Sequence, residues 1–127
     1  MTDNSFRINL LNNNIDTLSS QISINNEKLE QLRVAFTKIA SGQEEFMSNK
    51  RYTKMPELTS TTWAGRHADT FQDIRQEINN AYSRIGENDI EAVLSSIEEK
   101  IDYYTGLNRS FFNEISNNRQ RISELKD

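Results

Sequence analysis

Hydrophobic residues in the first part of the chain recur at alternating spacings of three and four residues. The series comprises Ile8, Leu11, Ile15, Leu18, Ile22, Leu29, Leu32, Phe36, Ile39 and Phe46. This heptad spacing places one apolar seam along a single side of an α-helix, and short β-strands cannot produce it. Since the pattern lasts about five heptads, it predicts one helix over about residues 5–50, roughly 65 Å long.

Two polar residues interrupt this seam, Asn25 and Gln43. A buried amide in a seam lowers stability, but it can set the register between two helices because it needs a matching partner opposite. The sequence leaves two alternatives for Asn25. It either sets the register of a helix pair in this way, or it lies at a gap in the seam that is open to water.

The pattern fades after Ser48, where Lys50, Arg51 and Lys54 precede the only proline, Pro56. Proline disfavours helical backbone at the residue before it and lacks a donor, so the first helix is expected to end between Met47 and Tyr52. The three cations give a weak footprint for phosphates, and we interpret them as a solvated loop, not as a nucleic-acid site.

A second series of hydrophobic residues follows the predicted turn. It comprises Phe71, Ile74, Ile78, Ala81 and Ile85 and then, in a shifted frame after Ile90, Leu94, Ile97, Ile101, Tyr104, Phe111, Ile115, Ile122 and Leu125. Asn108 and Asn118 interrupt the shifted series. The stretch from Gly86 to Asp89 either ends one helix and begins another, or absorbs the frame shift within a continuous helix.

Together the two series predict an all-α fold, an elongated antiparallel helical hairpin that resembles a coiled coil. The hairpin forms a single domain over residues 1–127, with a turn over about residues 51–62 and a second arm over about residues 63–125. This second arm is either intact or broken near Gly86.

The composition narrows the function. Only 35% of the residues are hydrophobic and the net charge is −4, which favours an elongated shape or burial completed by a partner chain. The chain has no cysteine, so thiol chemistry and disulfides are excluded. It begins without an apolar signal region, and no run approaches the about 18 apolar residues of a membrane span, so we expect any export to proceed without a cleavable Sec signal.

The predicted turn ends in Trp63-Ala64-Gly65, which contains the only tryptophan. Hydroxyl groups from Ser60 to Thr62 can cap the helix that follows. A large indole beside a glycine suits two helices that meet closely, so Pro56, Trp63 and Gly65 form a hairpin-turn motif, with Trp63 expected to pack near Phe46.

This arrangement resembles the WXG (ESAT-6-like) helical hairpins of bacterial type VII secretion, and in particular their YwqH-like subgroup. The residues that carry the resemblance are Pro56-Glu57-Leu58, Trp63-Ala64-Gly65, Ala68-Asp69, Phe71, Asp73-Ile74-Arg75, Ile78, Tyr82 and Ile97-Glu98-Glu99-Lys100-Ile101. The resemblance covers about half of the chain in motifs and nearly all of it in periodicity.

The resemblance implies a small helical adaptor or chaperone that binds the N-terminal helical domain of an LXG-type toxin before export. It implies a location in the bacterial cytoplasm before that step, with or without secretion alongside the cargo. The Tyr-X-X-X-Asp/Glu export pattern of many WXG proteins is missing, because Tyr82, Tyr103 and Tyr104 are followed at that spacing by Gly86, Leu107 and Asn108. We therefore expect a second small helical partner, or the toxin assembly, to supply the signal.

We expect no catalytic, cofactor or metal site. The only histidine, His67, has Asp69 and Asp73 nearby in the sequence, but neither lies three or four residues away on the same helical face. A metal site needs three or four converging ligands, so we interpret His67 as a surface residue. A small enzyme or metal-binding bundle is the least favoured of the possible functions.

Apolar residues beside the seams are candidates for partner binding because they make the hydrophobic face wider than a two-helix contact needs. They are Leu10, Ile24, Val34, Val93, Tyr103, Leu107 and Phe112. The alternative function is a self-associating coiled-coil scaffold or tether, in which a second copy of the chain covers these residues. No nucleic-acid partner is expected.

Replacing Trp63 with Ala tests the turn motif. If the indole is fully buried, we expect the substitution to lower the free energy of unfolding by about 3 kcal/mol, because a large cavity is left behind. Chemical denaturation followed by circular dichroism measures the loss. An unchanged midpoint together with unchanged partner binding would show that the motif has no structural role.

Overall fold

The computed structural model describes residues 2–55 and 65–127, with only the backbone of residues 2 and 3. Every element in these ranges is helical. The elements are α1 (Thr2–Ser48), the 3₁₀-helix η1 (Asn49–Lys54), α2 (Arg66–Ser83), the π-helix η2 (Arg84–Asp89) and α3 (Ile90–Lys126). The fold is therefore an all-α helical hairpin, as the seams predict, and α1 ends within the predicted range.

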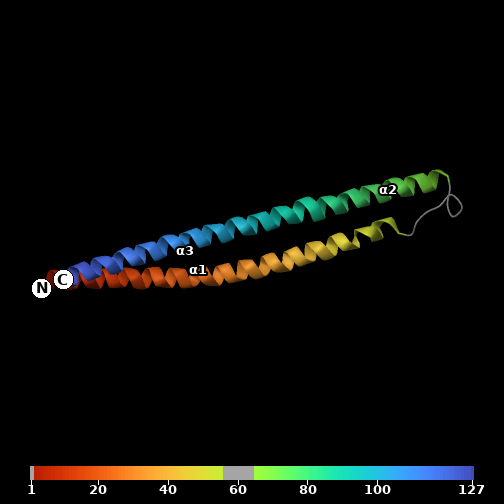
Figure 1. Cartoon of the computed structure of the whole chain (residues 1–127). Helices are drawn as coiled ribbons and strands as arrows, with labels where there is room; N and C mark the ends of the chain where they lie inside the picture. Colours follow the sequence, from red (N-terminus) through yellow and green to blue (C-terminus); the bar gives the residue numbers. More distant parts are fainter. Residues whose placement is uncertain (1, 56–64) are drawn as a thin grey trace. The chain divides into compact units, whose positions relative to one another are not determined.

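The chain packs as two compact units. The terminal unit combines Met1–Val34 with Glu98–Asp127, and the central unit is Ala35–Ile97. In the terminal unit, the Asn4 side-chain amide donates a hydrogen bond of 3.2 Å to the Leu125 carbonyl, so the beginning of α1 lies beside the end of α3 (Figure 1). The two helical segments of this unit are therefore antiparallel.

The terminal unit has a continuous hydrophobic core built from the predicted seam residues. Buried residues of the core are Ile15, Leu18, Ile22, Ile115 and Ile122, with Ile8, Leu11 and Phe111 packed against them. Full burial of a large aliphatic side chain stabilises a fold by about 1.5 to 3 kcal/mol. The seams of α1 and α3 thus account for the packing of this unit.

The central unit is held mainly by aromatic and polar contacts. The rings of Phe46 on α1 and Tyr82 on α2 are stacked, with centroids 3.8 Å apart, and the Tyr82 hydroxyl donates a hydrogen bond to the Phe46 carbonyl. Thr53 on η1 donates a hydrogen bond of 2.9 Å to the Asn79 side chain. These contacts orient α2 toward the end of α1 and toward η1.

Gln43, the second polar interruption of the seam, lies opposite η2. Its side-chain amide donates hydrogen bonds to the Gly86 carbonyl at 2.8 Å and to the Glu91 carboxylate at 3.0 Å. A helix with an extra residue loses regular backbone bonds locally, and side chains can satisfy the freed carbonyls. Gln43 therefore compensates for the irregular turn of the second arm.

The frame shift after Ile85 is resolved by η2, which joins α2 to α3 without a break. A π-helix turn accommodates one residue more than an α-helix turn, so the apolar spacing changes while the helix continues. Of the two alternatives at Gly86, the structure has the continuous helix.

The predicted seam over residues 71–85 is wrong for its three isoleucines, whereas its Ala81 is half-buried. Ile74, Ile78 and Ile85 are exposed, while Tyr82 is half-buried and Gly86 is buried against α1. The reason is that stacking on Phe46, the hydrogen bonds of Tyr82 and Asn79, and the close approach at Gly86 determine which face packs. On the side of α2 and η2, these contacts are made by Asn79, Tyr82 and Gly86, which do not belong to the apolar series of the second arm.

Part of the turn motif lies outside the described residues, namely Pro56, Trp63 and the proposed caps from Ser60 to Thr62. Gly65 is described and has a φ of 95°, a backbone conformation that residues with a side chain rarely adopt. Its carbonyl accepts a hydrogen bond of 3.1 Å from the Asp69 amide, so Gly65 is the N-cap of α2.

Replacing Gly86 with Ala tests the close approach in the central unit. A Cβ atom there would clash with the Met47 sulfur and would lie 3.2 Å from a Phe46 ring carbon. The flexible Met47 side chain must move aside, and the Phe46 ring, which is stacked on Tyr82, must shift slightly. We expect a loss of about 1 to 3 kcal/mol of stability, which outweighs the gain of about 1 kcal/mol in helix propensity.

Gly106→Ala is the matched control, since nothing lies within 4 Å of a Cβ atom at this helical position. We expect this variant to be more stable than the parent by up to about 1 kcal/mol. Denaturant unfolding followed by circular dichroism compares the two variants. Equal stabilisation by both substitutions would contradict the packing described for Gly86.

Candidate partner-binding surfaces

Exposed apolar residues of the central unit lie along α2 and η2. Ile74, Ile78 and Ile85, which we call the α2 stripe, are 52%, 53% and 43% exposed. Each of them immediately precedes a residue of the packed face, Arg75, Asn79 or Gly86. Since successive residues of a helix are about 100° apart, the α2 stripe is turned by roughly that angle from the face that contacts α1.

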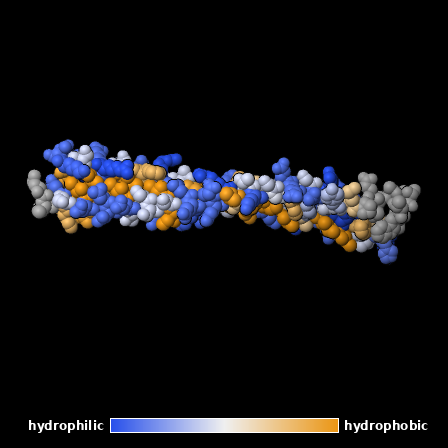
Figure 2. All heavy atoms as spheres, turned by 90° about the horizontal axis from the view of Figure 1, so that it is seen from below, coloured by the Kyte–Doolittle hydropathy of each residue, from blue (hydrophilic) through white to orange (hydrophobic). Residues whose placement is uncertain are grey.

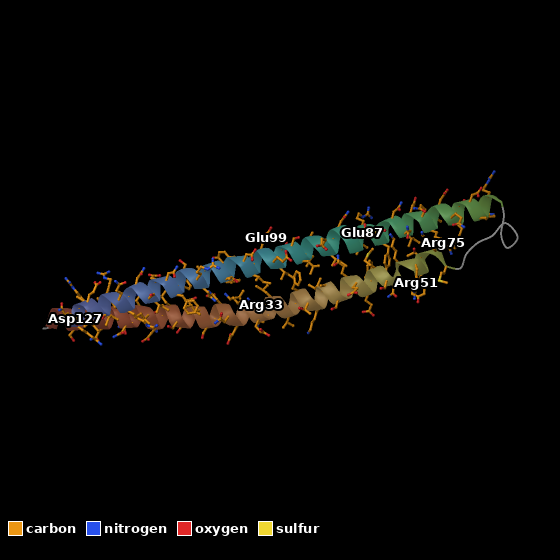
Figure 3. The ribbon with its side chains drawn as sticks, in the orientation of Figure 1. Arg33, Arg51, Arg75, Glu87, Glu99 and Asp127 are labelled. Carbon is orange, nitrogen blue, oxygen red and sulfur yellow. The ribbon has the colours of Figure 1, made fainter. Side chains whose placement is uncertain are left out.

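The packed face of α2 offers few apolar side chains in return. Ala68 is its buried hydrophobic residue, and Arg75, Asn79 and Tyr82 complete the face (Figure 3 labels Arg75). Arg75 also lies over the Phe71 ring, with its guanidinium carbon 5.0 Å from the centroid. The three isoleucines of the α2 stripe are therefore left at the surface of the unit, although their spacing of four and seven residues is typical of a helix contact.

The sequence could have identified this stripe. Counting backward from Leu94 in steps of four gives Ile90, Gly86 and Tyr82, and each of these faces α1 at least in part. The same count places the isoleucines beside the packed face. A count of apolar residues alone gives the other frame, because it leaves out Gly86 and the polar residues of α2.

The seven residues predicted to bind a partner lie on several surfaces. Leu10, Ile24, Val34, Val93, Tyr103 and Phe112 are exposed, and Leu107 is half-buried. Tyr103 and Leu107 both immediately precede inward-facing residues, so they share one flank of α3. Phe112 is nine residues from Tyr103, which places it about 180° away on the opposite flank. Figure 2 shows how hydrophobic residues reach the surface between hydrophilic ones.

The flank that carries Phe112 contains a groove of about 390 Å³ between α1 and α3. Leu29 and Phe112 supply its apolar lining, and Arg33 and Arg109 line it as well (Figure 3 labels Arg33). The arginines were not among the predicted site residues. Neither interrupts a seam, and their proximity becomes visible only once the register of α1 against α3 is known.

That register coincides with a buried pair of amides in the terminal unit. The Asn25 side-chain amide donates a hydrogen bond of 2.9 Å to the Asn108 side-chain oxygen, and Asn25 is 3% exposed. Asn108 in turn donates a hydrogen bond of 3.1 Å to the Asn26 side-chain oxygen. Asn25 is therefore buried and satisfied, not open to water, as a register-setting residue requires. Its effect on register remains a prediction.

The residues considered for a metal or acid-base site lie at the surface of α2. His67, Asp69 and Asp73 are exposed on α2. Among residues 2–55 and 65–127, no three His, Asp or Glu side chains cluster so that they could hold a metal ion. In the same ranges, no helix is both long and apolar enough to cross a lipid bilayer.

Comparisons with known proteins identify a family and one similar protein. A family model described as YwqH-like matches residues 7–127. The chain is also similar to Protein YxiB of Bacillus subtilis (strain 168), with 40% identity over 43 residues, which is 34% of this chain and 36% of that protein. The chain thus spans well under half of this relative. No solved structure gives a significant match.

A double-mutant cycle tests the amide pair. We expect Asn25→Ala and Asn108→Ala each to lower stability by about 1 to 3 kcal/mol, because each leaves a buried polar group of the other residue without its partner. The double variant should lose less than the sum, with a coupling energy of about 1 kcal/mol. Urea unfolding of the four proteins gives this value. Strict additivity would show that the two amides do not stabilise one another.

Proposed function

This chain belongs to the YwqH-like family, and on that premise we propose that it is a non-enzymatic helical adaptor for a toxin of the LXG type. It binds the N-terminal helical domain of the toxin in the bacterial cytoplasm and supports its export by a type VII secretion system. A second small helical partner supplies the export signal that this sequence lacks.

The observation that carries the proposal is the exposed α2 stripe. Three isoleucines spaced by four and seven residues lie on one side of a helix and form the kind of surface that an amphipathic helix covers with its own apolar stripe. Burial removes apolar surface from water at about 25 cal/mol per Å², so covering the stripe stabilises a complex. In the central unit, such a partner helix would supply the burial that α1 does not.

Exposed apolar residues elsewhere support the same reading. Val93 belongs to the central unit, and Tyr103 and Leu107 share a flank of the terminal unit. Aromatic residues on such surfaces are common interface anchors. The alternative, a self-associating scaffold, places a second copy of the chain on the same residues, and the experiment below separates the two.

Replacing Ile74, Ile78 and Ile85 together with Gln tests the proposal. The three side chains are exposed, so the helicity and stability of the lone chain should change little, while co-purification with the co-expressed LXG domain should be lost. The control is Gln76→Ala with Asn80→Ala, since both residues are exposed on α2, well away from the stripe.

Light scattering of the lone parent chain completes the test. The adaptor proposal predicts that the parent binds the LXG domain, that the control variant binds equally well, and that the Gln variant does not. A stable homodimer that ignores the LXG domain and dissociates in the Gln variant would support the scaffold instead. Undiminished binding by the Gln variant would show that the α2 stripe is not the docking surface.

A further inference from the structure

The groove between Arg33 and Arg109 differs from the α2 stripe in its chemistry. Its floor is Leu29, which is buried, and its wall is Phe112, which is more than half exposed. The two apolar side chains come from α1 and α3 of the terminal unit, so the groove depends on the pairing of these helices. It offers a site for one apolar side chain of a partner.

The groove is lined by basic residues, although the chain as a whole is acidic. Acidic residues outnumber basic ones by 19 to 15 overall, yet the lining includes two guanidinium groups and no carboxylate. A second groove of the terminal unit has the same character, with Arg7 and Arg121 beside leucines and again no carboxylate. Cations with apolar neighbours are electrostatically complementary to an acidic partner.

The polar groups at the base of the groove are already satisfied. Asn108 accepts a hydrogen bond from Asn25 and donates one to Asn26. Because these buried polar groups already have hydrogen-bond partners, they do not require a polar ligand. What remains is an apolar contact on Leu29 and Phe112 between two cations. Two cations are few for nucleic-acid binding, which gains its affinity from many phosphate contacts.

We infer that this groove receives an acidic amphipathic helix of the toxin's N-terminal domain, an inference that rests on the proposed function. The helix places an apolar side chain between Leu29 and Phe112. An Asp or Glu lies one turn before or after it, because residues three or four apart share a helical face. Its carboxylate meets Arg33 or Arg109, whose planar guanidinium groups can bind a carboxylate through two parallel hydrogen bonds.

Charge reversal at both arginines tests this inference. Arg33→Glu with Arg109→Glu places like charges against the acidic helix, and we expect the affinity for the purified LXG domain to fall about tenfold or more. The affinity of the parent should also decrease when the NaCl concentration is raised from about 50 to about 500 mM. This salt dependence should be weaker in the variant. Titration calorimetry gives both quantities.

Lys38→Glu with Arg119→Glu is the matched control. It makes the same change in net charge on the same two helices, at exposed residues outside the groove. We expect its affinity to stay within about twofold of the parent, because rim charges far from a contact are screened. Arg33→Gln with Arg109→Gln provides a second groove variant without like-charge repulsion, and circular dichroism checks that each variant is folded.

The outcomes separate this inference from the proposed function. Selective weakening by the groove variants supports the acidic helix. If the parent binds the LXG domain and both groove variants bind as tightly, the adaptor function stands and the groove is not its acidic docking site. Equal loss of affinity in the groove variants and the control variant would contradict the inference, because it would show a general effect of net charge and not a specific contact. An LXG domain that does not bind the parent overturns both.

Discussion

The surface that α2 presents depends on one extra residue in the π-helix η2. A strict heptad extended backward from Leu94 and Ile90 would turn Glu87, Ser83 and Asn80 toward α1. The π turn adds one residue, and the structure accordingly has Gly86, Tyr82 and Asn79 on the packed face. The isoleucines lie one residue further around the helix. A single insertion is therefore enough to pack α2 but not enough to bury its apolar stripe.

The contacts opposite η2 are matched to this extra residue. Gly86 lets Met47 and Phe46 approach closely, and Gln43 satisfies the Gly86 carbonyl. An apolar residue at position 43 would extend the seam but leave that carbonyl without this donor, at a cost of about 1 to 3 kcal/mol for a buried group. The polar interruption of the first helix and the irregular turn of the second are thus two parts of one interaction.

The two units differ in how completely they bury their apolar residues. The terminal unit has a continuous core of isoleucines and leucines, whereas Ala68 and Leu94 are the buried hydrophobic residues of the described part of the central unit. Exposed isoleucines at helical spacing are costly in a lone chain and favourable in a complex. The central unit therefore exposes apolar residues of the kind that a partner helix would cover.

The sequence predicted the features that depend on local periodicity. These are the extent of α1, the helical second arm and the core of the terminal unit. It failed for the face of α2, because glycine approach, aromatic stacking and side-chain hydrogen bonds outweighed the apolar count there. The arginine groove could not be found either, since Arg33 and Arg109 are 76 residues apart and meet only through the register of the two helices.

The roles assigned to the turn motif and to the seven partner-binding residues remain predictions. The structure adds that these seven residues do not form one continuous face, because Phe112 lies opposite Tyr103 on α3. Phe112 is instead part of the groove that contains the two arginines. A partner that contacts both flanks would need more than one helix.

The reactivity of a single cysteine introduced at Ile78 tests the central claim most directly, since the chain has no cysteine of its own. With Ile78→Cys, the account predicts rapid labelling by a maleimide in the lone chain and strong protection when the LXG domain is added. Ile22→Cys, at a buried core position, serves as the slow reference in both states. Slow labelling of the Ile78→Cys thiol in the lone chain, or equal rates with and without the LXG domain, would contradict the account.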